Sequence, residues 1–268
     1  MKNNNKSSTY SLIIEKIFLE KFSVGDSTVN FTRNDIVCVA NDMKVALPKN
    51  LGDVIYSFRY RCQLPEAIVK TAPKGLEWII EGTGDAKYVF TLRKINRIEP
   101  NPNLIDIKIP NATPGIVESN ALNDEQAALA IVRYNRIIDL FLGITAYSLQ
   151  NHLRTKVKKI GQIEVDEIYV GVNKCGQQFV IPVQAKGGTD KHSIVQTTQD
   201  VIFCAEKFPN LTCRPVSVQH MGKGRVAMFE LCLVNNEIKL LDEKHYILVN
   251  GADISQEDLD LYKKLKPD

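Results

Sequence analysis

The sequence of 268 residues lacks long apolar runs and lacks a strong excess of either charge. Its apolar runs, such as residues 127–132, are far shorter than the ~20 residues that a membrane-spanning helix needs, so we expect no transmembrane segment. The first ten residues lack the apolar core of a secretory signal, which favours a cytoplasmic protein. With 34 basic against 31 acidic side chains, the formal net charge of +3 is too small to indicate a nucleic-acid partner by itself.

Several motifs of well-known function classes are also missing. The six cysteines are scattered and include no C-x-x-C pair, so we expect reduced thiols and no structural zinc. The chain has no P-loop, no dinucleotide-binding glycine pattern and no Ser-His-Asp spacing. These absences argue against nucleotide-driven, dinucleotide-dependent and serine-hydrolase chemistry.

What is present is enough apolar material for a packed core, since 44% of the residues are hydrophobic and 24% are charged. The length allows two domains, which we place at residues 1–115 and 116–268. In the first domain, apolar periodicity predicts a helix over residues 10–22, and Thr32 to Asp35 matches a capping box that opens a second helix. A third helix over residues 48–62 and a hairpin over residues 76–92 follow.

Three helices followed by a hairpin is the order of a winged helix, a relative of the helix-turn-helix that binds DNA through its third helix. That third helix carries Arg59 and Arg61, which are residue types that contact phosphates and base edges. A small α+β domain with an ordinary solvated charged face is the plain alternative.

The second domain is expected to be of the α/β class, with a mixed central sheet flanked by helices. Proline and asparagine between residues 99 and 122 indicate a linker or crossover. The patterns that follow predict helices over residues 123–142, 145–156 and 190–207, strands over residues 162–172, 177–186, 215–219 and 225–234, and a surface helix in the acidic tail.

We predict that the strands over residues 162–172 and 177–186 form a hairpin. A three-residue loop whose last residue is Gly176 is a favoured hairpin closure, and it places Asp166 opposite Gln184 and Glu164 opposite Lys186. Because side chains alternate along a strand, these four polar groups share one face, while Glu167 points to the other. A two-residue loop would shift the register by one residue and separate them.

An acid, an amide and a lysine on one face of an otherwise apolar hairpin have two explanations. One is an ordinary cross-strand ion pair on a solvated surface. The other is a divalent-metal site, in which a carboxylate holds Mg²⁺ and a nearby lysine orients the attacking water and offsets negative charge in the transition state. The cost of burying unpaired charge is what motivates the second explanation.

Asp166 near the start of one strand and Gln184-Ala185-Lys186 near the end of the next resemble the core of the PD-(D/E)xK nuclease superfamily, which has the restriction-endonuclease-like fold. The resemblance implies that Asp166 is a metal-bridging acid, that Gln184 occupies the second motif position, that Lys186 is the catalytic lysine and that the Ala185 carbonyl completes the metal shell. Gln184 departs from the usual Glu and contributes no charge, and Glu164 on the same face is our candidate to replace it.

Basic residues flank this motif on both sides. His152, Arg154, Lys156, Lys158 and Lys159 precede it without an intervening acid, Gln150 lies just before them, and Lys191 follows the motif. Such a collar around a carboxylate site would attract a polyanion. An ordinary solvated basic surface is the alternative.

The sequence therefore predicts a Mg²⁺-dependent endodeoxyribonuclease that cleaves double-stranded DNA, with Mn²⁺ able to substitute. A type II restriction enzyme is one form that this activity takes, and the resemblance allows a homodimer. Two rivals stay open. One is a non-catalytic DNA-binding regulator in which the sheet is purely structural, and the other is a structure-specific repair enzyme or an RNA nuclease built on the same core.

Overall fold

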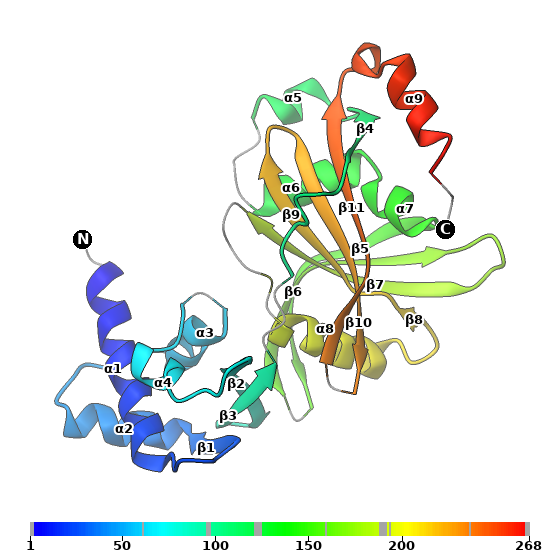
Figure 1. Cartoon of the computed structure of the whole chain (residues 1–268). Helices are drawn as coiled ribbons and strands as arrows, with labels where there is room; N and C mark the ends of the chain where they lie inside the picture. The colour runs from blue at the N-terminus through cyan, green and yellow to red at the C-terminus, as the bar shows by residue number, and fades with distance from the viewer. Residues whose placement is uncertain are drawn as a thin grey trace. The chain divides into compact units, whose positions relative to one another are not determined.

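A computed structural model describes residues 3–60, 62–94, 98–120, 125–158, 160–187, 192, 194–235 and 237–265 (Figure 1). The chain divides into two compact units. The first comprises residues 1–96 and 155–163, and the second comprises residues 97–154 and 164–268. Within the described ranges, no helix has both the length and the apolar character needed to cross a membrane.

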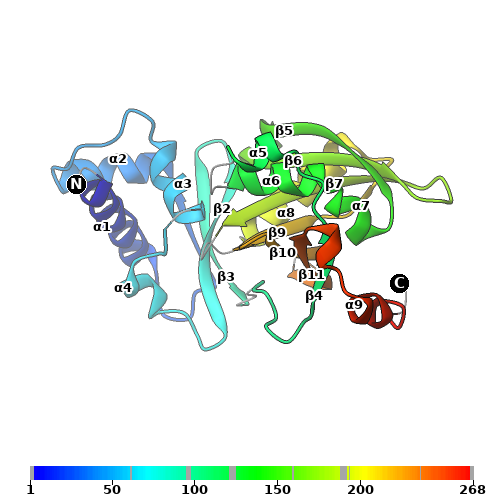
Figure 2. The ribbon, with the colours of Figure 1, turned by 90° about the horizontal axis from the view of Figure 1, so that it is seen from above.

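The first unit contains helices and a three-stranded antiparallel sheet in the order β1-β3-β2 (Figures 1 and 2). Its elements are α1 (Asn3–Lys21), β1 (Thr28–Thr32), α2 (Arg33–Asp42), α3 (Gly52–Tyr60), α4 (Glu66–Val69), β2 (Leu76–Gly84) and β3 (Lys87–Lys94). The expected hairpin is present as β2 and β3. Strand β1 is an element that the sequence analysis missed.

Local chemistry explains where α2 begins. The Thr32 hydroxyl accepts a hydrogen bond from the Asp35 backbone N–H at 3.4 Å, and the Asp35 carboxylate accepts one from the Thr32 N–H at 2.6 Å. This reciprocal capping box satisfies N–H groups that a helix start leaves without partners, and it confirms the predicted cap.

The core of the first unit is aromatic. Phe18 of α1 lies edge-on to both Trp78 of β2 and Phe90 of β3, with ring centroids 5.0 Å apart in each pair. The Trp78 indole N–H donates to the Thr71 hydroxyl at 2.9 Å, so the buried ring also satisfies its polar atom. These contacts pack the helices onto one face of the small sheet.

The second unit is a mixed α/β arrangement in which helices flank an eight-stranded sheet, so this coarser part of the predicted fold class is confirmed. The strands along the sheet follow the order β4-β11-β10-β9-β7-β6-β5, with β8 paired to β7. The pairs β7–β9 and β4–β11 are parallel, whereas β6–β7, β9–β10 and β10–β11 are antiparallel. The elements are β4 (Asp106–Pro110), α5 (Gly115–Glu118), α6 (Glu125–Tyr134), α7 (Ile137–Leu142), β5 (Thr145–Val157), β6 (Gly161–Val172), β7 (Gln178–Gly187), α8 (Ile194–Lys207), β8 (Thr212–Cys213), β9 (Val216–Gly222), β10 (Arg225–Val234), β11 (Glu237–Val249), the short 3₁₀ helix η1 (Gly251–Asp253) and α9 (Gln256–Tyr262).

Three expectations for this region were wrong. Residues 145–156, expected to be helical, form most of the edge strand β5. The single helix expected to end at residue 142 is broken into α6 and α7, because Arg136 adopts a left-handed φ of 50°, and Gly143 then ends α7 in the same region of φ/ψ space. The segment 99–122, expected to be a linker or crossover, contains β4 and α5, and β4 pairs with β11 in the larger sheet although the first domain was expected to extend to residue 115.

The hairpin of β6 and β7 has the register that a three-residue loop predicts. Paired residues run from Val172 opposite Gln178 to Glu167 opposite Val183. Gly176 has a φ of 79°, the left-handed value required at the last loop position. This register places Asp166 and Gln184 next to each other at the following position, on the face away from Glu167.

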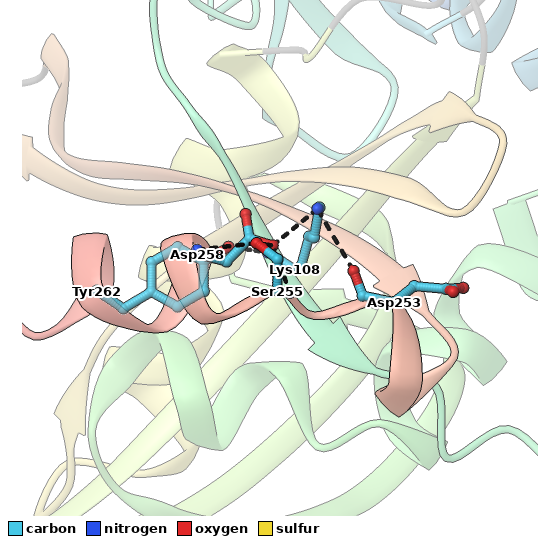
Figure 3. Close-up of polar contacts among 5 residues, drawn as sticks. All are labelled: Lys108, Asp253, Ser255, Asp258 and Tyr262. Carbon is cyan, nitrogen blue, oxygen red and sulfur yellow. Dashed lines mark hydrogen bonds and ion pairs between the residues drawn. The ribbon is translucent and has the colours of Figure 1, made fainter.

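Hydrogen bonds and an ion pair join the C-terminal helix α9 to the edge strand β4 (Figure 3). The Lys108 ammonium lies 2.8 Å from the Asp258 carboxylate and 3.5 Å from the Asp253 carbonyl oxygen, and the Lys108 backbone N–H donates to the Tyr262 hydroxyl. Asp258 also accepts from the Ser255 backbone N–H at the start of α9. One carboxylate therefore serves both a helix cap and an ion pair.

Candidate functional site

The structure gathers the three motif residues beneath α8. Asp166 of β6 is 9% exposed, and Gln184 and Lys186 of β7 are 3% and 8% exposed. All three surround the carboxylate of Asp200 on α8, to which Gln184 is hydrogen-bonded and on which Asp166 and Lys186 act electrostatically. The predicted motif is thus a cluster of buried polar side chains.

Asp166 is positioned by the neighbouring strand. The pairing of β6 with β7 reaches Glu167 and Val183, and at the next position the Asp166 carboxylate accepts the Ala185 backbone N–H at 2.9 Å. A side chain therefore occupies the place where a backbone carbonyl would continue the ladder. The contact fixes the carboxylate against the start of the Gln-Ala-Lys motif.

Asp200 is a site residue that sequence reasoning missed. It is 2% exposed, and its Oδ2 accepts a hydrogen bond from Gln184 Nε2 at 2.7 Å. The helical spacing in the sequence could have identified it, because Asp200 shares the buried face of α8 with Phe203 and Cys204 at the i+3 and i+4 positions. An acid on the apolar face of a helix requires a partner, and Gln184 is that partner.

Burial raises the pKa of the Asp200 carboxyl well above its ordinary value, and the nearby charge of Asp166 raises it further. The Gln184 hydrogen bond and the Lys186 ammonium oppose this rise. Two oxygen atoms of the pair, Gln184 Oε1 and Asp200 Oδ1, are buried without a hydrogen-bond partner among the described residues. Burying an oxygen atom without a hydrogen-bond donor costs free energy, so these two oxygens are candidate ligands for a metal ion.

A histidine lies beside the lysine. The His192 ring is buried and packs edge-on against Phe229, with centroids 5.4 Å apart. Burial first, and then the charge of Lys186, lowers the pKa of His192 to about 3, while the nearby Gln219 acts in the opposite direction. His192 is therefore neutral at physiological pH.

Glu164, our candidate replacement for the missing acid, interacts with the neighbouring edge strand. Its Oε1 lies 3.1 Å from His152 Nε2 and 3.2 Å from an Arg154 guanidinium nitrogen, both on β5. His152 and Arg154 belong to the predicted DNA-binding run, so two side chains of that run contact an acid of the predicted metal site. Gln150, on the same strand, is exposed.

The opposite face of β6 carries a separate polar cluster. The fully buried Glu167 accepts hydrogen bonds from Arg133 of α6 at 2.9 Å and from the Ser148 hydroxyl of β5. Burial, followed by the charge of Glu167, raises the pKa of the nearby Tyr169 hydroxyl. Because Glu167 contacts α6 whereas the motif residues lie beneath α8, the two helices cover opposite faces of the sheet.

The remaining predicted DNA contacts lie elsewhere. Arg59 is half-buried on α3 of the first unit, and Lys156 is exposed on the part of β5 that belongs to that unit. Arg61 and Lys191 lie outside the described residues. The structure therefore assigns Arg59 and Lys156 to one unit, and Gln150, His152 and Arg154 to the other.

The donors of the site fit a hard cation. Across the described ranges, no three His, Cys, Asp or Glu side chains gather in a manner typical of a metal site. The cluster offers instead two carboxylates, from Asp166 and Asp200, together with the amide oxygen of Gln184. Oxygen donors of these kinds are the ligands that Mg²⁺ and Ca²⁺ prefer, whereas a zinc site would be expected to include His or Cys.

Comparisons of the chain with protein-family models, with curated proteins and with solved structures found no match. They identify neither a family nor an activity.

Proposed function

We propose that this protein is a divalent-metal-dependent nuclease that hydrolyses phosphodiester bonds in DNA. The observation that carries the proposal is the cluster of Asp166, Gln184 and Lys186 on one face of the β6–β7 hairpin, with the carboxylate of Asp200 beside it. A purely structural sheet would have no need for two acids and a lysine in its interior, because burying them is costly.

The residues have distinct roles in this proposal. Asp166 and the oxygen donors next to it would hold Mg²⁺, with Mn²⁺ able to substitute. When bound, the metal supplies charge stabilisation and an activated water. Lys186 orients that water and offsets the negative charge that develops on the phosphate.

The order of elements supports a restriction-endonuclease-like fold. The helices α6 and α7 are followed by β5, β6 and β7, then by α8, by the two-residue strand β8 and by β9, which is parallel to β7. Apart from β8, this is the α-β-β-β-α-β order that the resemblance implies, with the acid on the second strand and the lysine on the third. Strand β5, which we expected to be a helix, provides the first strand of this order.

The first unit is proposed to be a winged helix that binds DNA. Its order α1-β1-α2-α3-α4-β2-β3, with the four-residue helix α4 between α3 and the hairpin, and its sheet order β1-β3-β2 support this assignment (Figure 1). In such a module α3, which carries Arg59, would enter the major groove. Double-stranded DNA is accordingly the proposed substrate, and a homodimer would let each strand meet one site.

Measuring cleavage and DNA binding in the same variant distinguishes the proposed nuclease from a DNA-binding regulator. Lys186→Ala should abolish cleavage while leaving the affinity for duplex DNA unchanged, because Lys186 acts on the scissile phosphate and not on the rest of the duplex. Lys174→Ala, in the exposed loop of the same hairpin, is the matched control and should cleave normally. A regulator would bind DNA without cleaving it, with or without Lys186.

The nucleic-acid class is tested with parallel substrates. Supercoiled plasmid, linear duplex, branched DNA and RNA should be incubated with Mg²⁺ or Mn²⁺ at the same protein concentration. Cleavage of plasmid and linear duplex supports the proposed endonuclease. Cleavage confined to branched DNA or to RNA would instead assign the same core to repair or to RNA hydrolysis.

A further inference from the structure

Gln184 leaves the motif with one acid fewer than the usual Glu-x-Lys pattern, and the structure contains an acid at that position in space. Asp200 reaches it from α8, which follows β7 in the chain. Its carboxylate is 2.7 Å from the amide nitrogen of Gln184, so the carboxylate and the amide form one buried pair. The acid is distant in sequence from the motif but adjacent to it in the fold.

We propose that Asp200 is the second acidic metal ligand of this site, replacing the carboxylate that Gln184 lacks. The inference rests on the proposed function. Gln184 Nε2 binds one carboxylate oxygen of Asp200 and so orients the other, and the amide oxygen of Gln184 becomes a further ligand. Gln184 Oε1 and Asp200 Oδ1 are the two atoms left without a partner among the described residues, as this division of roles requires.

The charges of the site support this assignment. Among the described residues, the Asp166 carboxylate, the Cys213 thiol and the Lys186 ammonium act electrostatically on Asp200. With Asp166 and Asp200 both ionised, two carboxylates lie close together in a buried site, and a divalent cation bound between them would offset their mutual repulsion.

Glu164 is less suited to the same role. Its carboxylate already contacts two cationic or protonatable side chains, His152 and Arg154, at 3.1 and 3.2 Å. Binding a metal through Glu164 would weaken both interactions, whereas Asp200 Oδ1 has no donor to give up within the described part of the chain. The buried acid on α8 is thus the better complement to Gln184.

The pair also explains why an amide occupies position 184. A Glu at that position would bring two carboxylates to a separation of 2.7 Å, beside the third carboxylate of Asp166. Like charges at that distance cannot both ionise at neutral pH. Gln184 and Asp200 should therefore be exchangeable as a pair, with one acid and one amide, but not singly.

The test measures Mn²⁺ binding by isothermal titration calorimetry, together with thermal denaturation in EDTA, on the full chain. Asp200→Asn keeps an oxygen that accepts from Gln184 and should weaken Mn²⁺ binding at least about tenfold, because an acidic ligand is lost. Its melting temperature in EDTA should equal or exceed that of the wild type, because a buried charge is removed. Glu206→Gln, an exposed acid-to-amide change on the same helix, is the control and should bind Mn²⁺ normally.

A double variant that exchanges the acid and the amide provides the decisive measurement. Gln184→Glu combined with Asp200→Asn restores one acid and one amide in contact, so the double variant should bind Mn²⁺ more tightly than Asp200→Asn alone. Normal Mn²⁺ binding in Asp200→Asn, with binding lost in Asp166→Asn, would refute the role of Asp200 and leave the proposed nuclease intact. Normal binding in Asp200→Asn, with binding lost in Glu164→Gln, would have the same consequence. A wild-type protein that binds no Mn²⁺ would overturn both.

Discussion

Removing Arg133 should destabilise the protein by leaving the buried Glu167 carboxylate without its cation. Glu167 is fully buried, and the Arg133 guanidinium is its cationic partner at 2.9 Å. Breaking a buried ion pair by removing one partner typically costs about 3–5 kcal/mol. The Arg133 side chain is itself 37% exposed, so water can partly replace it, and the Ser148 hydroxyl still donates to Glu167. We therefore expect Arg133→Met to lower the free energy of unfolding by about 2–3 kcal/mol.

The assay is urea denaturation at neutral pH, followed by circular dichroism. Adding Glu167→Gln to Arg133→Met removes the stranded charge and should recover most of the lost stability. A cost below about 0.5 kcal/mol for Arg133→Met, typical of a surface substitution, would contradict the burial of Glu167. Failure of the double variant to recover would do the same. Either result would undermine the assignment of Glu167 and Asp166 to opposite faces of β6.

Other predictions concern stability elsewhere in the chain. The Lys108 ion pair lowers the pKa of Asp258 from 3.8 to about 2, and Asp258 in turn raises the pKa of Lys108. The pair therefore stabilises the fold between about pH 4 and the ordinary pKa of lysine. This stabilisation is lost as the pH falls through about 2 or rises through the raised pKa of Lys108. Asp258→Asn should accordingly lower the melting temperature near pH 7 but not near pH 2, and an equal difference at both pH values would contradict the ion pair. Gly176→Ala should cost about 1–2 kcal/mol in urea denaturation because φ is 79°, whereas Gly115→Ala, with open space around it, should be close to neutral. Phe90→Ala should cost about 3–5 kcal/mol by the same assay, and a loss below 1 kcal/mol would be inconsistent with its fully buried ring.

The hairpin that forms the site could be predicted because its geometry is local. A glycine at the end of a three-residue loop sets the register, and the register sets which side chains share a face. The pairing of Val172 with Gln178 follows that rule. Asp166, Gln184 and Lys186 could therefore be placed together without knowledge of the rest of the fold.

What could not be predicted depended on contacts between distant segments. Strand β5 lies at the sheet edge and is exposed over most of its length, so it lacks the alternation that marks a half-buried strand. Its basic residues and scattered apolar positions are equally compatible with a surface helix. Asp200 was missed for a related reason, since its partner is known only once α8 is placed over β7.

We propose that the cluster of Asp166, Gln184, Lys186 and Asp200 hydrolyses DNA with the help of a divalent cation. The most direct measurement is the nicking or linearisation of supercoiled plasmid by the purified protein with Mg²⁺, with wild type and Asp166→Ala compared at equal concentration. We expect cleavage by the wild type that EDTA abolishes and that Asp166→Ala lacks. Cleavage that persists in Asp166→Ala, or a folded wild type that leaves plasmid, branched DNA and RNA intact with either Mg²⁺ or Mn²⁺, would contradict it.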